Sequence, residues 1–355
     1  MPKRRILILA LLLVIIQPTT GPVLGAAPPP AASSLQPDPL VAGLIAQVQQ
    51  QDLYGRLQAL TGETSITVGG QAATLLTRHT ESGQIATATA YAYEFFQGQG
   101  LASSYHQWQG TGDDGDWLTG RNVIGELHGS LHPDEIVLIT AHLDDLPRGP
   151  RAPGADDNAS GSVAVMTAAA GLAGPSFERT VRFVLFTGEE QGLLGSHEYA
   201  QDCADAGEEI VAVLNMDKIG WDDNDDGAIY LETRRTSNSG YPADLAIANL
   251  FIQVIQTYDL DTVLDPSIDP CSDPWVDSWS FWSAGFPSVT ATEDWDWDEL
   301  NPYYHSVEDT VATLNLPYYT YYVKAVVGTA AHLALPLSSL SFEYAIYLPL
   351  LLKKH

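Results

Sequence analysis

The chain alternates between short apolar runs and longer stretches with helical spacing. Runs rich in β-branched residues predict buried strands at 136–140, 181–186 and 210–216, and a further strand is predicted at 122–127. Apolar residues at helical spacing predict helices at 39–60, 85–100 and 160–173. This alternation is typical of an α/β fold with a mostly parallel central β-sheet flanked by helices on both faces.

Polar side chains follow three of these predicted strands. His142 and Asp144 come after the first, Glu189 and Glu190 after the second, and Asp217 after the third. The carboxyl ends of parallel strands share one edge of the sheet, and sites in open α/β sheets are built there. At this spacing Asp144 could accept a hydrogen bond from the second ring nitrogen of His142, which would fix the imidazole tautomer.

Two more stretches carry candidate ligands. The turn at 154–158 holds Asp156 beside a second aspartate, directly ahead of a predicted helix of small residues, and His305 lies between aromatic residues near the C-terminus. Adjacent carboxylates on such a turn favour a cation site over a core position. Two histidines and several carboxylates, with few thiols, suit a borderline cation such as zinc, and an acid shared between two ions gives a two-metal hydrolytic site.

Composition limits the classes of partner. The chain has 355 residues, 45% of them hydrophobic, with a formal net charge of −28. So strong a negative charge argues against nucleic acid and anionic membranes as partners. It fits an acidic protein that collects divalent cations, although solubility alone would also account for it.

The two ends of the chain differ in composition from the middle. A basic start at 3–5, an apolar run at 6–16 and small residues at 23–26 predict a secretion signal over 1–26 and an exported protein. Residues 27–40 are rich in Pro, Ala and Ser and predict a flexible leader or short pro-segment, followed by one domain over 41–336. The apolar tail at 337–355 is too short to span a bilayer, and is either a final strand or docking segment or a surface-sorting tail.

Two smaller features invite structural hypotheses. Cys203 and Cys271 are the two cysteines, and an exported protein can join such a pair as a disulfide, the alternative being two inert thiols. Asp222, Asn224 and Asp226 place oxygens at alternate positions, as in a calcium loop. The acid expected at position twelve of that loop is a threonine, so an acidic turn without calcium is the alternative.

Five segments together resemble the zinc aminopeptidases of the M28 peptidase family, and they occur in that family's order. They are Ala-His-Leu-Asp (141–144), Pro-Gly-Ala-Asp-Asp-Asn-Ala-Ser-Gly (153–161), Phe-Thr-Gly-Glu-Glu-Gln-Gly-Leu-Leu-Gly-Ser (186–196), Leu-Asn-Met-Asp (214–217) and Asn-Pro-Tyr-Tyr-His-Ser-Val-Glu-Asp-Thr (301–310). The resemblance implies a zinc-exopeptidase-like three-layer sandwich that removes N-terminal residues from peptides with a free N-terminus.

The resemblance also implies roles for individual residues. Two zinc ions would each have ligands of their own and would share one carboxylate. Asp144 would orient His142, and Glu189 would act as the general base. The implied private ligands are His142 and Asp217 for one ion and Glu190 and His305 for the other, and the implied shared carboxylate is Asp156.

The chain departs from the family pattern at one point. Where the family often has Ser-Asp-His, this sequence has Val276-Asp277-Ser278, which puts local support or substrate contacts in doubt. Tryptophans cluster in sequence near this segment. Trp279 and Trp282, with Tyr304, are candidates for the wall of a substrate pocket, core packing being the alternative for the tryptophans.

Three other functions remain open on the same sequence. A carboxypeptidase or dipeptidase would need basic side chains for a substrate carboxylate, and the few candidates are Arg148, Arg151, Arg234 and Arg235. A one-zinc acyltransferase similar to glutaminyl cyclases would need fewer ligands than this chain offers. A non-catalytic binding domain would not need Glu189.

Overall fold

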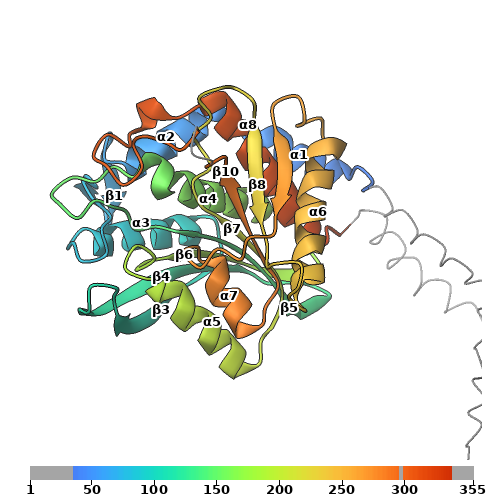
Figure 1. Cartoon of the computed structure of the whole chain (residues 1–355), viewed down its shortest axis with the longest axis horizontal. Helices are drawn as coiled ribbons and strands as arrows, with labels where there is room; N and C mark the ends of the chain where they lie inside the picture. The colour runs from blue at the N-terminus through green and yellow to red at the C-terminus, as the bar shows by residue number, and fades with distance from the viewer. Residues whose placement is uncertain (1–34, 296–298, 338–355) are drawn as a thin grey trace, which may run out of the picture. The chain divides into compact units, whose positions relative to one another are not determined.

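A mixed β-sheet of eight strands forms the centre of the computed structural model, which describes residues 35–295 and 299–337. The strand order is β3-β4-β6-β5-β7-β10-β8-β9, and β6, β5, β7 and β10 form a parallel centre with antiparallel pairs at β3–β4, β4–β6 and β10–β8 (Figure 1). The strands are β3 Ala102–Thr111, β4 Trp117–Leu127, β5 His132–His142, β6 Arg179–Phe186, β7 Glu209–Met216, β8 Ala228–Glu232, β9 Asp265–Asp269 and β10 Ser288–Glu293.

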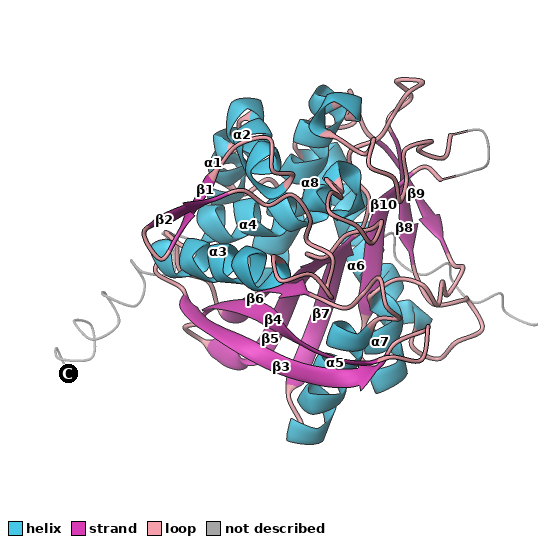
Figure 2. Ribbon diagram, turned by 90° about the vertical axis from the view of Figure 1, so that its left-hand side faces the viewer, coloured by secondary structure: helices cyan, strands magenta, loops and turns pink. Residues whose placement is uncertain are grey.

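Helices cover both faces of this sheet, which confirms the predicted fold class (Figure 2). One face carries α1 Pro39–Gln47, α2 Gln50–Leu60, α3 Ile85–Gly98, α4 Gly161–Leu172, α6 Tyr241–Thr257 and α8 Leu316–Ala334. The other carries α5 Leu194–Ala206 and α7 Ser278–Ala284. A two-stranded hairpin, β1 Ile66–Val68 and β2 Gln71–Ala73, stands apart from the main sheet.

The central strand β5 shows why its apolar run is unbroken. Val137 and Ile139 pack into the core under α4 and α8, whereas Ile136 and Leu138 pack into the smaller core under α5 and α7. Successive side chains of a strand point to opposite faces, so a strand covered on both sides needs apolar residues at every position.

The elements differ from the predicted ones mainly at their ends. The helix predicted at 39–60 is two helices, because Val48 and Gln49 have extended backbones between α1 and α2. The strand predicted at 122–127 begins five residues earlier, at Trp117. The helix predicted from 160 is preceded by a kinked turn, η1 Ala155–Ser160, which carries the two adjacent aspartates and is non-helical at Asp157 and Asn158.

The predicted segment boundaries are only partly within the described residues. The secretion signal lies outside them, as does the tail beyond 337. The predicted leader at 27–40 overlaps α1, which begins at Pro39. Asp38 caps that helix by accepting from the backbone N–H of Leu40 at 2.7 Å. Among the described residues, none of the helices has the length and apolar character needed to cross a membrane.

Candidate metal centre

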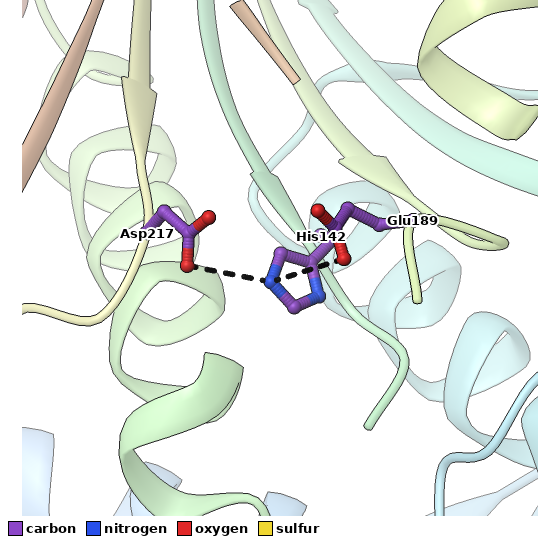
Figure 3. A group of neighbouring side chains, drawn as sticks. All are labelled: His142, Glu189 and Asp217. Atoms are coloured by element: carbon purple, nitrogen blue, oxygen red, sulfur yellow. Dashed lines mark ion pairs between the residues drawn. The ribbon is translucent and has the colours of Figure 1, made fainter. Parts of the chain in front are cut away.

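The candidate site lies at the carboxyl ends of the parallel strands, where the sequence placed it. His142 is the last residue of β5, Glu189 follows β6 after a short turn, and Asp217 follows β7 directly. Figure 3 shows the three side chains turned toward one another from these separate strand ends. Parallel pairing of β5 with both β6 and β7 brings them together, although they are far apart in sequence.

His142 is surrounded by carboxylates. Its Nε2 atom lies 3.5 Å from Oδ1 of Asp217 and 4.0 Å from Oε2 of Glu189 (Figure 3). The same Nε2 lies 3.2 Å from Oδ1 of Asp157. The imidazole is only 1% exposed, so these acids rather than water form its surroundings.

The second histidine faces two acids in a similar way. Nε2 of His305 lies 3.1 Å from Oδ2 of Asp157 and 3.2 Å from Oε2 of Glu190. The ring of Tyr304 stacks on the His305 ring with centroids 3.7 Å apart. The two oxygens of Asp157 therefore face two different histidines.

Asp157, rather than the expected Asp156, presents its carboxylate to both histidines. Asp156 points elsewhere: its Oδ1 accepts from the backbone N–H of Gly220 at 2.9 Å, and its Oδ2 accepts from Nδ2 of Asn301 at 2.8 Å. Both oxygens are thus occupied by hydrogen bonds within the protein. Neighbouring residues in this turn point in different directions, and no local feature of the sequence told the two aspartates apart.

Asp309 fixes the turn that carries these aspartates. Its carboxylate accepts from the backbone N–H groups of Asp156 at 3.0 Å and Asp157 at 3.1 Å. Asp309 stands four positions after His305, but its side chain was not among the predicted site residues.

Asp144 lies beside His142, as predicted, but its contacts differ from the expected ones. Nδ1 of His142 is 3.2 Å from the backbone oxygen of Asp144 and 3.7 Å from its carboxylate Oδ1. The other oxygen, Oδ2, accepts from the hydroxyl of Thr80 and the N–H of Gly188, both at 2.9 Å. A carbonyl can only accept, so this contact directs the Nδ1 hydrogen of His142 toward Asp144 and turns Nε2 toward the acids.

The donor set fits divalent cations. In a tetrahedral zinc site with bonds of about 2.0–2.1 Å, ligand atoms lie about 3.3–3.4 Å apart. The separations of 3.2 and 3.5 Å around His142 and of 3.1 and 3.2 Å around His305 are close to that spacing. They are longer than the 2.7–2.9 Å of a typical charge-assisted hydrogen bond. Among the described residues, buried Oε1 of Glu190 also has no hydrogen-bond partner.

The pKa values of these side chains also support a cation site. Burial acts to lower the pKa of His142, but Glu189 and the neighbouring aspartates raise it well above the usual value. Burial opposes the rise at His305 too, yet Asp157 and Glu190 raise its pKa to about 9. Burial, together with Asp157, raises the pKa of Glu190 to about 7. Without a cation the cluster holds protons, and a bound cation would take their place.

Glu189 lies farther from Nε2 of His142 than the two aspartates do. Its Oε2 lies 4.0 Å from His142, farther than the Asp157 and Asp217 oxygens. Burial raises its pKa well above the usual value, with His142 opposing and Glu190 adding to the rise. A carboxylate with a raised pKa beside a cation site suits general acid–base work.

Lys218 contacts the candidate ligand Asp217 and was not among the predicted site residues. Its Nζ lies 3.0 Å from Oδ1 of Asp217 and 5.4 Å from the centre of the Tyr304 ring. The residue directly follows Asp217 in the chain, so adjacency to a candidate ligand was a signal that could have found it.

The three candidate substrate-binding residues are placed differently. Trp282 is buried, at 7% exposure, and its Nε1 donates to the backbone oxygen of Ser288 at 2.9 Å. It is therefore a core residue, which corrects the pocket assignment. Trp279 and Tyr304 are each 40% exposed and can meet a ligand, and Tyr304 also touches His305.

A cavity of about 590 Å³ opens beside the candidate centre. Its lining includes Thr80 and Thr187, and Thr80 also bonds to Asp144. Arg121 and Trp108 also line it, and Nε1 of Trp108 donates to the hydroxyl of Thr187 at 2.9 Å. The position of the cavity suits the part of a ligand that extends beyond the reacting group.

Cys203 and Cys271 are not joined. Cys203 is buried in the core between α5 and the sheet, whereas Cys271 follows β9 beside Glu232 and Asp269. The two thiols pack against different elements, which rules out the predicted disulfide in this structure.

The candidate calcium loop is held by hydrogen bonds within the protein. Oδ1 of Asn224 accepts from the N–H of Asp226 at 2.9 Å, and Oδ1 of Asp226 accepts from the N–H of Ala228 at 2.8 Å. Asp222 Oδ2 accepts from Asn315 at 3.2 Å. These hydrogen bonds can hold an acidic turn in place without calcium. Calcium binding at this loop stays a prediction.

The chain matches the model of peptidase family M28 over residues 122–329. A probable leucine aminopeptidase of Arthroderma benhamiae is 35% identical over 211 residues, 57% of this chain and 55% of the relative. Leucine aminopeptidase 1 of Trichophyton rubrum is 28% identical over 309 residues, 83% of this chain and 76% of the relative. The chain spans about half the length of the first of these curated relatives.

Solved structures share the fold at low sequence identity. The Legionella pneumophila LapA aminopeptidase superposes with a TM-score of 0.69 at 21% identity, covering 91% of this chain and 81% of that one. A zinc aminopeptidase from Bacillus subtilis gives 0.64 at 14%, covering 81% and 96%. The Porphyromonas gingivalis glutaminyl cyclase also gives 0.64, at 16%, covering 80% and 98%, so likeness of fold alone does not separate these activities.

The family match covers the whole candidate centre, from His142 to His305, and extends over more than half of the chain. We conclude that this chain is a member of peptidase family M28.

Proposed function

We propose that this protein is an exported aminopeptidase that binds two zinc ions and removes N-terminal residues from peptides. One observation carries the proposal: Asp157 presents its two carboxylate oxygens to two different histidines, at 3.2 Å and 3.1 Å. A carboxylate so placed can be shared by two cations. Leucine aminopeptidases among the relatives support the reaction class.

The residues divide into two ligand sets around the shared Asp157. His142 and Asp217 would hold one zinc ion, while Glu190 and His305 would hold the other. Zinc supplies Lewis acidity there, which lowers the pKa of water and polarises a carbonyl group. The calcium ion considered for the loop at 222–227 is not needed for this chemistry.

Glu189 is the proposed general base. Its carboxylate faces the centre from the turn after β6, 4.0 Å from Nε2 of His142, and would accept a proton from an attacking water molecule there. The same carboxylic acid then donates that proton to the amine that leaves as the peptide bond breaks. Asp144 supports this step by accepting from the N–H of Gly188, which holds the turn that carries Glu189.

Export rests on the N-terminal sequence. A basic segment at 3–5 followed by the apolar run at 6–16 and small residues at 23–26 is typical of a cleaved secretion signal. Cleavage after residue 26 would leave a chain that begins shortly before α1. The N-terminal sequence of protein recovered from the medium of an expressing cell would test this directly.

The reaction is tested with purified protein and a matched variant. We would count bound zinc and measure release of Leu from Leu-p-nitroanilide, beside the N-acetylated substrate, for wild type and Glu189→Gln. We expect two zinc ions, cleavage of the free-amine substrate only, and a loss of at least about a hundredfold in kcat for Glu189→Gln with zinc retained.

Other outcomes would redirect the proposal. A single zinc ion, or formation of a cyclic product from an N-terminal glutamine peptide, would favour an acyltransferase similar to the glutaminyl cyclases. Cleavage that does not need the free amine would favour a carboxypeptidase or dipeptidase. Zinc-loaded protein that turns over none of a peptide panel would indicate a binding domain.

A further inference from the structure

A second group of potential metal ligands lies outside the centre described above. Glu232 ends β8, Asp269 ends β9, and Cys271 follows two residues later. One ligand atom from each residue lies within 4.8 Å of the other two. None of the three is shared with the centre built around Asp157.

The backbone explains why these side chains meet. Strands β8 and β9 pair in parallel with Glu232 opposite Asp269, so the two carboxylates come from neighbouring positions in the sheet. After β9 the chain stays beside the end of β8: the N–H of Ser272 donates to the oxygen of Thr233, the residue after β8, at 3.0 Å. Arg235 secures the same segment by donating from Nε to the Cys271 oxygen at 3.0 Å.

Glu232 is the informative member of the group. It is 1% exposed, and its buried Oε2 has no hydrogen-bond partner among the described residues. A buried carboxylate oxygen without a donor is costly, so such an atom points to a ligand that the protein itself does not provide. Lys218 is a nearby cation, but its Nζ already lies 3.0 Å from Asp217.

We propose that Glu232, Asp269 and Cys271 form a further cation site, which binds a borderline-soft divalent ion such as zinc through one thiolate and two carboxylates. The sulfur argues against calcium and magnesium, which prefer oxygen ligands alone. Three protein ligands plus water would complete a tetrahedral shell.

Glu232 and Cys271 both have raised pKa values, so a bound ion would displace protons from them. Burial raises the pKa of Glu232 to about 8, and Asp273 adds to the rise. Burial also raises the pKa of the Cys271 thiol, with Glu232 and Asp269 adding to the rise. Both groups therefore hold protons without an ion, and binding at neutral pH would release them.

Cobalt absorption tests the proposal on the purified full chain, after a chelator has removed bound metal. Cobalt bound to a thiolate gives a sulfur-to-metal charge-transfer band in the near ultraviolet, and the centre around His142 and His305 contains no sulfur. We expect wild type titrated with CoCl₂ to show the band, Cys203→Ser to keep it, and Cys271→Ser to lose it. Glu232→Gln should weaken cobalt binding at this site by at least about tenfold.

Alkylation of the unmutated chain gives a second measurement. Mass spectrometry would follow iodoacetamide labelling of Cys271 with and without added zinc, with buried Cys203 as the internal comparison. We expect zinc to slow the labelling of Cys271 at least tenfold. A wild type without the band, a band that survives Cys271→Ser, or labelling that zinc leaves unchanged would each overturn the proposal. The activity of the aminopeptidase centre enters none of these readouts.

Discussion

Asp156 and Asp157 are consecutive, yet their carboxylates have entirely different partners. Asp156 accepts hydrogen bonds from the N–H of Gly220 and the side chain of Asn301. Asp157 faces the Nε2 atoms of His142 and His305. Asp156 therefore connects the surrounding loops, whereas Asp157 presents both oxygens to the candidate metal centre.

The two asparagine variants separate these roles. Asp157→Asn keeps the shape but removes the charge and one acceptor oxygen, so we expect it to retain at most one zinc ion and to lose more than about a thousandfold in kcat/KM. Asp156→Asn should keep both ions and lose about 10–100-fold, as changes behind metal ligands commonly do. Zinc content and Leu-p-nitroanilide kinetics would be measured side by side. Equal zinc loss in both variants would contradict the assignment.

Replacing Arg78 should lower the free energy of unfolding. It is fully buried, and its guanidinium donates to the backbone oxygens of Leu143, Pro153 and Gly154, next to the segments that carry His142 and Asp157. Its guanidinium also lies 3.3 Å from the carboxylate of Asp145.

Arg78→Met leaves Asp145 buried without the guanidinium and frees four backbone carbonyls, because Leu60 also accepts from this side chain. We expect it to lower the free energy of unfolding by about 3–5 kcal/mol. Urea unfolding would measure this, with Arg151→Met, a change at an exposed arginine of the same loop region, as the control. A loss below about 1 kcal/mol would show that the buried pair is not needed.

Glu232 should make the stability of the metal-free protein depend on pH. Burial raises its pKa in the folded state to about 8, above the ordinary value of 4.5 that applies to the unfolded chain. The folded state then binds a proton that the unfolded state has released, so this group makes stability fall as pH rises from 4.5 to about 8. Glu232→Gln should remove this slope, which is worth on the order of a few kcal/mol. Urea unfolding with chelator at several pH values would reveal it, and parallel profiles for wild type and variant would refute the prediction.

Lys218 predicts an effect on metal affinity. Its ammonium lies 3.0 Å from Asp217 and so competes with a cation for that carboxylate. We expect Lys218→Met to tighten zinc binding by about tenfold, because removing a positive charge a few ångströms away favours the ion. Lys324→Met, a change on helix α8 at a lysine that contacts Tyr321, is the control. Competition with a chelator would measure affinity, and unchanged or weaker binding of the Lys218 variant would count against this interpretation.

The sequence by itself determined the architecture and the place of the centre. Short apolar runs rich in β-branched residues, such as 136–140, indicate buried strands. Polar residues at their ends, among them His142, Glu189 and Asp217, meet because parallel strands share an edge. Spacing and strand ends are local features, so they can be read along one dimension.

Tertiary structure alone decided which atoms face each other. The direction of Asp157 rather than Asp156 depends on Asp309 and Gly220, residues 152 and 64 positions away from their partners in the turn. The burial of Trp282 and the separation of Cys203 from Cys271 likewise depend on the elements packed around them. The convergence of Glu232 with Cys271 requires the pairing of β8 with β9. These are long-range contacts, and a side chain's direction follows from the packing of distant segments, which no local pattern encodes.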